Sequence, residues 1–144
     1  MTVVFLMTVF SGLSMAAREQ QSPQRPAAAE KDTRTPAQQK INSQVLYEIY
    51  RRRGEAAKKA VPPGATGVKI DKKGRALVDV RVDVTPAIAR AIGKAGGTIV
   101  STSPEYHSVI AWIPLLKLEA LAENPVVRAI EPAADAMTNP KAVS

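Results

Sequence analysis

The stretch RALVDVRVDV, residues 75–84, begins the part of the chain that decides the fold. From Val78 on it alternates apolar and charged residues, which is the period-two pattern of a strand buried on one face. The valines form one face of this strand, and Asp79, Arg81 and Asp83 form the other. We therefore predict a strand with its valines in the core and its charged residues toward solvent.

Helical and β-rich patterns follow this strand in a recognisable order. Thr85-Pro86 pairs a capping hydroxyl with a proline at the first helical position, and Gly96-Gly97 ends the helix that it starts. The remaining predicted elements are a hairpin of two strands, a short helix and a last strand: Thr98–Thr102, Tyr106–Ile113, Leu115–Glu123 and Val126–Ile130. The order β-α-β-β-α-β is that of the ferredoxin-like fold. Residues 75–131 are thus predicted to form an α+β domain, an antiparallel sheet with two helices on one face.

The segment before this domain divides into three parts. Residues 1–17 are apolar, end in small residues and indicate a signal peptide or an N-terminal membrane anchor. Residues 18–40 are rich in Gln, Pro, Ala and charge, which predicts a disordered linker. Residues 41–60 predict an extra amphipathic helix, which needs a partner or the domain itself to cover its apolar stripe. That stripe is Val45, Leu46, Ile49 and Tyr50.

Residues 132–144 (PAADAMTNPKAVS) follow the last strand and show no periodicity. Small residues and prolines without an apolar pattern predict a flexible tail.

Composition excludes several classes of site. The chain has no cysteine and one histidine, which excludes disulfides, thiolate metal sites and multi-histidine zinc sites. Its net charge of +7 is concentrated in residues 18–75, which carry 14 Lys/Arg against 6 Asp/Glu. Residues 76–144 carry 6 against 7, so the predicted domain is close to neutral. Arg51–Arg53 and Lys58-Lys59 could contact phosphates, but the neutral domain and the lack of a base-stacking aromatic motif argue against nucleic acid.

The predicted strand Tyr106–Ile113 supplies the candidate interaction surface. Alternation places one set of its side chains inward: His107, Val109, Ala111 and Ile113. The other set, Tyr106, Ser108, Ile110 and Trp112, then faces outward on a central strand. Exposed apolar patches mark interaction sites, and Trp and Tyr dominate binding energy at interfaces. Two alternatives stay open: the alternation is inverted, or the 41–60 helix covers this face.

No catalytic constellation emerges from the sequence. His107 has no identifiable nucleophile or orienting carboxylate around it, and a triad needs both. Asp79 and Asp83 are read as solvated strand residues near Arg81 rather than as a catalytic pair. We therefore expect no enzymatic activity, no metal and no small-molecule cofactor.

The segment from about Ala76 to Asn139 resembles the inhibitor I9 propeptides that precede subtilisin-like serine proteases. The likeness rests on the Val-rich first strand, the helix ending in Gly-Gly before Thr98-Ile99-Val100, and the closing phrase NPVVRAIE, residues 124–131. The resemblance implies a partner, a subtilisin-like serine protease. The apolar segment at residues 1–17 indicates export, so the expected location is secreted, periplasmic or in the cell envelope. Contact with a membrane is expected only through residues 1–17, if they are not cleaved.

The same resemblance implies how binding would occur. The outer sheet face, with Tyr106, Ile110 and Trp112, would dock on the protease. The tail would enter the active-site cleft in the manner of a substrate, through Ala136, Met137, Thr138 and Asn139. Two alternatives from other classes remain: a non-catalytic interaction module that joins envelope proteins through the 41–60 helix, and a truncated protease precursor.

Overall fold

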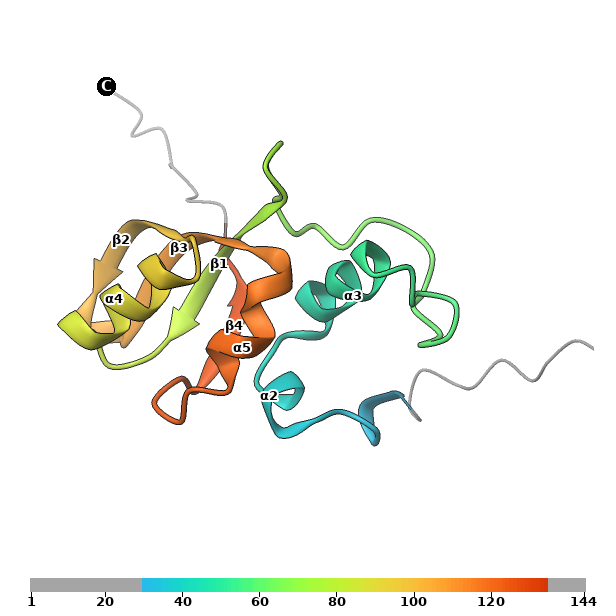
Figure 1. Cartoon of the computed structure of the whole chain (residues 1–144), viewed down its shortest axis with the longest axis horizontal. Helices are drawn as coiled ribbons and strands as arrows, with labels where there is room; N and C mark the ends of the chain where they lie inside the picture. The colour runs from blue at the N-terminus through green and yellow to red at the C-terminus, as the bar shows by residue number, and fades with distance from the viewer. Residues whose placement is uncertain (1–29, 135–144) are drawn as a thin grey trace, which may run out of the picture.

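A four-stranded antiparallel sheet forms the centre of the structure, a computed structural model that describes residues 30–134 (Figure 1). Its strands lie in the order β2-β3-β1-β4. They span Arg75–Arg81 (β1), Thr98–Ser103 (β2), Ser108–Pro114 (β3) and Ala129–Pro132 (β4). Helix α4, Pro86–Lys94, joins β1 to β2, and helix α5, Leu118–Ala122, precedes β4. The predicted α+β fold with an antiparallel sheet is confirmed, and the strand order is that of a ferredoxin-like domain.

The local signals in the first half of the domain act as predicted. Val78 and Val80 of β1 are fully buried, while Asp79 between them and the other residues of the alternate set are only half-buried. The side-chain oxygen of Thr85 accepts a hydrogen bond from the backbone N–H of Ile88 at 3.3 Å, which caps α4. Ile88 and Ile92 then bury the inner face of that helix against the sheet.

The turn between β2 and β3 is longer than predicted. Pro104–Tyr106 form a short 3-10 helix, η1, and His107 follows it with φ of 49°. Strand β3 therefore begins at Ser108, and the predicted inward position of His107 is wrong: the imidazole lies in the turn, exposed to solvent. From Val109 on the predicted alternation is confirmed, with Val109, Ala111 and Ile113 buried.

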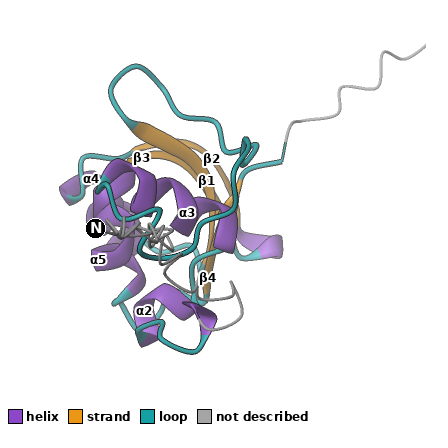
Figure 2. Ribbon diagram, turned by 90° about the vertical axis from the view of Figure 1, so that its right-hand side faces the viewer, coloured by secondary structure: helices purple, strands orange, loops and turns teal. Residues whose placement is uncertain are grey.

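Helix α3, Ser43–Arg52, lies on the same side of the sheet as α4 and α5 (Figure 2). It is shorter than the predicted helix over residues 41–60, because the chain turns at Gly54 with φ of +72°. Its apolar stripe is fully buried in the common core: Val45, Leu46, Ile49 and Tyr50. Within residues 30–134, no α-helix packs over the other face of the sheet (Figure 2).

The predicted disordered linker is wrong for residues 30–40, while its residues 18–29 lie outside the described part of the chain. The N-terminus of helix α2, Pro36–Gln39, is capped by reciprocal hydrogen bonds between Thr35 and Gln38, a capping box. Ile41 is 2% exposed and forms a parallel bridge with Ile130 of β4. Backbone hydrogen bonds of 2.8 Å from Asn42 to Ile130 and from Ile130 to Lys40 fix this pairing. Residues 30–41, here called the N-terminal arm, are ordered because Ile41 adds to the edge of the sheet. Composition alone does not reveal such a pairing.

Within residues 30–134, no helix combines the length and the apolar character that crossing a bilayer requires. The segment predicted as a signal peptide or anchor, residues 1–17, lies outside that range, as does all of the predicted tail beyond residue 134.

Candidate functional site

The outer face of the sheet carries a small apolar patch, here called the sheet patch: Leu77, Ile110 and Trp112. Leu77 of β1 lies directly opposite Trp112 of β3, and Ile110 lies opposite Asp79. All three side chains are half-buried, although no α-helix of the described residues covers this face (Figure 2). Directly opposite residues on antiparallel strands have Cβ atoms about 5 Å apart, so the Leu77 and Trp112 side chains form one continuous apolar surface.

Small polar residues border this patch on the side of β2, and Arg75 Nη1 donates to Thr98 Oγ1 at 3.1 Å. Thr98 lies opposite Trp112, and Ser101 lies opposite Ile110. A β-bulge falls between Ile99 and Ser101, and Val100 within it is 57% exposed. The short side chains of Thr98 and Ser101 do not extend over the larger residues beside them.

Charged residues border the patch and satisfy one another. The Ser108 hydroxyl donates to Asp79 Oδ1 at 2.6 Å, and Arg81 Nη2 lies 3.1 Å from Asp79 Oδ2. Arg81 Nη1 also donates to the carbonyl oxygen of Tyr106 at 3.3 Å. The carboxylate of Asp79 is therefore neutralised within the face, so a partner that docks there does not have to desolvate an unpaired charge.

The structure separates the three predicted docking residues. Ile110 and Trp112 share the outer face as predicted, but Tyr106 lies in the η1 turn, before β3 begins, and is 72% exposed. The hydrogen bond from Arg81 links the backbone of Tyr106 to the face. Leu77 was not among the docking residues predicted from the sequence. Leu77 lies two residues before Asp79 on the same strand face, so counting by twos along the strand identifies it.

The end of the sheet also fixes where the tail leaves the domain. Strand β4 ends at Pro132, opposite Val78, and the backbone N–H of Ala133 donates to the carbonyl oxygen of Leu77 at 3.2 Å. The chain thus leaves the sheet beside the backbone of a sheet-patch residue. The predicted cleft-inserting residues, Ala136, Met137, Thr138 and Asn139, lie outside the described residues.

A second group of polar side chains surrounds Asp83 at the other end of β1. His107 Nδ1 lies 2.6 Å from Asp83 Oδ1, and Arg128 Nη2 donates to the same carboxylate at 2.8 and 2.9 Å. All three side chains are more than half exposed. Within residues 30–134 the imidazole has Asp83 as its hydrogen-bond partner and no hydroxyl or thiol, so the group lacks the nucleophile of a triad. Nor does any cluster of three or more potential metal ligands occur in that range.

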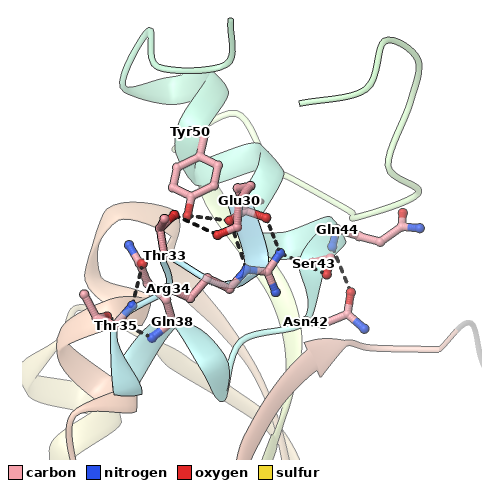
Figure 3. Close-up of polar contacts among 9 residues, drawn as sticks. All are labelled: Glu30, Thr33, Arg34, Thr35, Gln38, Asn42, Ser43, Gln44 and Tyr50. Carbon is pink, nitrogen blue, oxygen red and sulfur yellow. Dashed lines mark hydrogen bonds and ion pairs between the residues drawn. The ribbon is translucent and has the colours of Figure 1, made fainter. Parts of the chain in front are cut away.

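A buried ion pair fastens the N-terminal arm to α3 (Figure 3). Arg34 holds the Glu30 carboxylate with two hydrogen bonds of 2.9 and 2.8 Å, and the Tyr50 hydroxyl donates to the same carboxylate at 3.0 Å. Arg34 Nη2 also donates to Ser43 Oγ at 3.1 Å. The side chains of Glu30 and Arg34 are 3% and 8% exposed.

The environment of this pair shifts the pKa of each member. Burial would raise the pKa of Glu30, but the hydrogen bonds from Arg34 and Tyr50 outweigh it, and the net pKa is lowered. Burial, together with the bond to Glu30, raises the pKa of the Tyr50 hydroxyl, while the bond to Glu30 raises that of Arg34. Within residues 30–134 no buried side-chain nitrogen or oxygen lacks a hydrogen-bond partner, so the cluster anchors the arm.

Comparison of the chain with protein-family models, with curated proteins and with solved structures found no match.

Proposed function

We propose that this chain binds a subtilisin-like serine protease as a propeptide-type inhibitor. The outer sheet face would lie against the protease surface, and Ala136, Met137, Thr138 and Asn139 would occupy the active-site cleft. The observation that carries the proposal is the sheet patch, which no α-helix of residues 30–134 covers, because α3 packs on the opposite side of the sheet (Figure 2).

The sheet patch has the composition of an interface centre. Trp112 and Ile110 supply an aromatic and an aliphatic anchor, and the short polar residues of β2 supply a rim. A stable interface needs about 800 Å² from each partner, which is more than three side chains provide. The tail, which leaves the sheet beside Leu77, would supply the remaining area in this proposal.

The proposal is tested by titrating the full chain against a panel of subtilisins with a peptide substrate. Inhibition in the micromolar range or tighter is expected, and Trp112→Ala should weaken it at least about tenfold. Val126→Ala is the matched control, because Val126 is 54% exposed and lies between α5 and β4. The absence of inhibition, or equal losses in both variants, would refute docking through this face.

The alternative of an adaptor that joins envelope proteins through the 41–60 helix loses its docking surface. The apolar stripe of α3 packs into the protein's own core, because Val45, Leu46 and Ile49 are completely buried. A truncated protease precursor would use the same sheet face in cis, and a search of the adjacent coding DNA for a protease domain tests that origin. Either form of the proposal places the chain outside the cytoplasm, which cell fractionation tests.

A further inference from the structure

Two neighbouring hollows on the helix side of the sheet share the side chain of Lys117. The first, of about 350 Å³, lies between the end of α3, the turn at residues 72–74 and the 3-10 helix η2, Leu115–Lys117. The second, of about 340 Å³, lies between α4 and α5. Both are open to solvent, and neither includes a residue of the sheet patch.

Five cations border these hollows, and together they define what we call the basic trough: Arg52, Lys72, Lys73, Lys94 and Lys117. All five are exposed, and none forms an ion pair within residues 30–134. No Asp or Glu of that range lines either hollow. The basic trough is therefore a concentration of positive charge without internal compensation.

Three carboxylates that lie close to trough residues in the sequence are bound to other cations. Asp71 pairs with Arg75 at 2.7 Å, and its Oδ1 also accepts from two backbone N–H groups of its own turn. Glu48 pairs with Arg51 at 2.8 Å, and Glu119 pairs with Arg53. Each of these three carboxylates is thus matched to an arginine outside the trough, and none of them pairs with a trough cation.

One of the five cations is held against the backbone. Gly74 has φ of +74°, and a Cβ atom at this position would lie 2.9 Å from Nη2 of Arg52. The glycine therefore lets the guanidinium lie directly on the turn that carries Lys72 and Lys73. This contact brings residues from two distant segments to one rim of the first hollow.

The floor of the basic trough is apolar. Pro114 and Leu116 line the first hollow, and Leu116 is 48% exposed. The second hollow is lined largely by small or aliphatic side chains: Ala91, Ala95, Ala120 and Leu121. A ligand that fits both features needs an anionic group and an aliphatic group a few ångströms apart.

We propose that the basic trough binds an acidic peptide segment of a protein partner, with an aliphatic side chain over the alanine-lined hollow and carboxylates on the surrounding cations. Helical peptides in grooves use this combination of spaced aliphatic anchors and flanking charge. Single-stranded nucleic acid is the less suitable ligand, because its bases stack on aromatic side chains and none lines either hollow within residues 30–134. This inference is independent of the proposed protease binding, since it concerns the opposite side of the sheet.

The test uses the full chain and a fluorescein-labelled peptide of about 15 residues, roughly four helical turns, with Glu and Leu at helical spacing. Fluorescence anisotropy measures its affinity at low salt and at physiological salt. Two comparison peptides replace every Glu by Gln or every Leu by Ala, and an oligothymidylate of similar length tests a polyphosphate ligand. Both comparison peptides are expected to bind at least about tenfold more weakly, and the Glu-containing peptide should weaken as salt rises.

The variant K72E/K73E should weaken binding of the acidic peptide about tenfold or more, because two attractions become repulsions. The matched control K31E/K58E makes the same change in net charge at exposed lysines outside the trough and should change affinity less than about threefold. K117E is a second trough variant in a different element, and thermal melts confirm that each variant is folded. Equal losses in the trough and control variants would overturn the site. Tighter binding of the oligothymidylate, or no loss with the Leu-to-Ala peptide, would overturn the peptide as its ligand.

Discussion

Removing the charge of Arg34 provides the sharpest test of how the arm is held to the domain. In the variant Arg34→Met the aliphatic part of the side chain is retained, while both hydrogen bonds to Glu30 are lost. Glu30 would then be a carboxylate with 3% of its side chain exposed and only the Tyr50 hydroxyl as a side-chain partner. Breaking a buried ion pair on one side costs about 3–5 kcal/mol, because an uncompensated charge remains.

The loss should be read from urea unfolding at neutral pH. A domain of this size is stable by about 5–15 kcal/mol, so a loss of about 3 kcal/mol is large and would lower Tm by roughly 10 °C or more. Trp112 is the only tryptophan and, being half-buried on β3, reports unfolding by fluorescence. The matched control is Arg128→Met, whose partner Asp83 is 61% exposed, and it should cost less than about 1 kcal/mol.

The pH dependence separates a lost charge pair from simple mispacking. In the native protein the pKa of Glu30 lies below its usual value of 4.5, so the pair stabilises fully above pH 4.5 and is lost as pH falls through the native pKa. In Arg34→Met the burial of Glu30 dominates, its pKa rises, and protonation relieves the variant as the solution is acidified. The difference in unfolding free energy between wild type and variant should therefore begin to shrink above pH 4.5, as pH falls through the raised pKa of Glu30 in the variant. It should shrink further below pH 4.5, where the wild type loses its own pair. A difference that is constant with pH, or below about 1 kcal/mol at neutral pH, would refute the buried pair.

Three further predictions concern the core and the docking face. Ile49→Ala should cost about 2–5 kcal/mol in urea unfolding, because Ile49 is completely buried between α3 and the domain; a loss below 1 kcal/mol would mean that α3 is not part of the core. Gly97→Ala should destabilise by several kcal/mol and more than Gly93→Ala, because its Cβ would lie 2.7 Å from Ile92 Cγ2 and 2.9 Å from the Ile92 carbonyl oxygen, whereas Gly93 has open space; equal effects would contradict this packing. Deletion of residues 135–144 should leave Tm within a few degrees of the full chain and abolish the proposed protease inhibition; a deletion that keeps full potency would exclude the tail as the cleft-binding segment.

The elements that the sequence predicts well are those whose signals are local. The alternation from Val78, the cap at Thr85 and the glycine stop after Lys94 each report the conformation of a few neighbouring residues. The same alternation predicts strand β3, but it places the start at Tyr106, two residues before the observed start at Ser108. Its start depends on a 3-10 turn and on the positive φ of His107, which period-two counting cannot detect in a β-rich sequence.

The sequence does not predict that residues 30–40 are ordered, because the residues that hold this segment in place lie far from it in the sequence. Ile41 pairs with Ile130, and Glu30 is fixed by Tyr50, so neither contact leaves a pattern inside the segment itself. Composition gave the opposite answer, since prolines, glutamines and charges are also typical of disordered chains.

The basic trough illustrates the same limit for function. The sequence drew attention to the continuous run Arg51–Arg53, but two of these arginines are neutralised by Glu48 and Glu119. The free cations come from four separate elements, and only Arg52 belongs to the run. A run of charges in a sequence therefore shows how many cations are present and not which of them are available to a ligand.

The side of the sheet on which the N-terminal arm and α3 pack determines both proposed surfaces. Had α3 covered the open face of the sheet, it would have hidden Ile110 and Trp112 and removed Arg52 from Lys117. Instead the buried stripe of α3 and the edge pairing at Ile41 hold the arm on the helix side. With α3 on the helix side, one face of the sheet is apolar and nearly neutral. The trough cations, which have no ion-pair partners within residues 30–134, lie on the other side. The two faces therefore suit chemically different partners, and no residue of the sheet patch lines the basic trough.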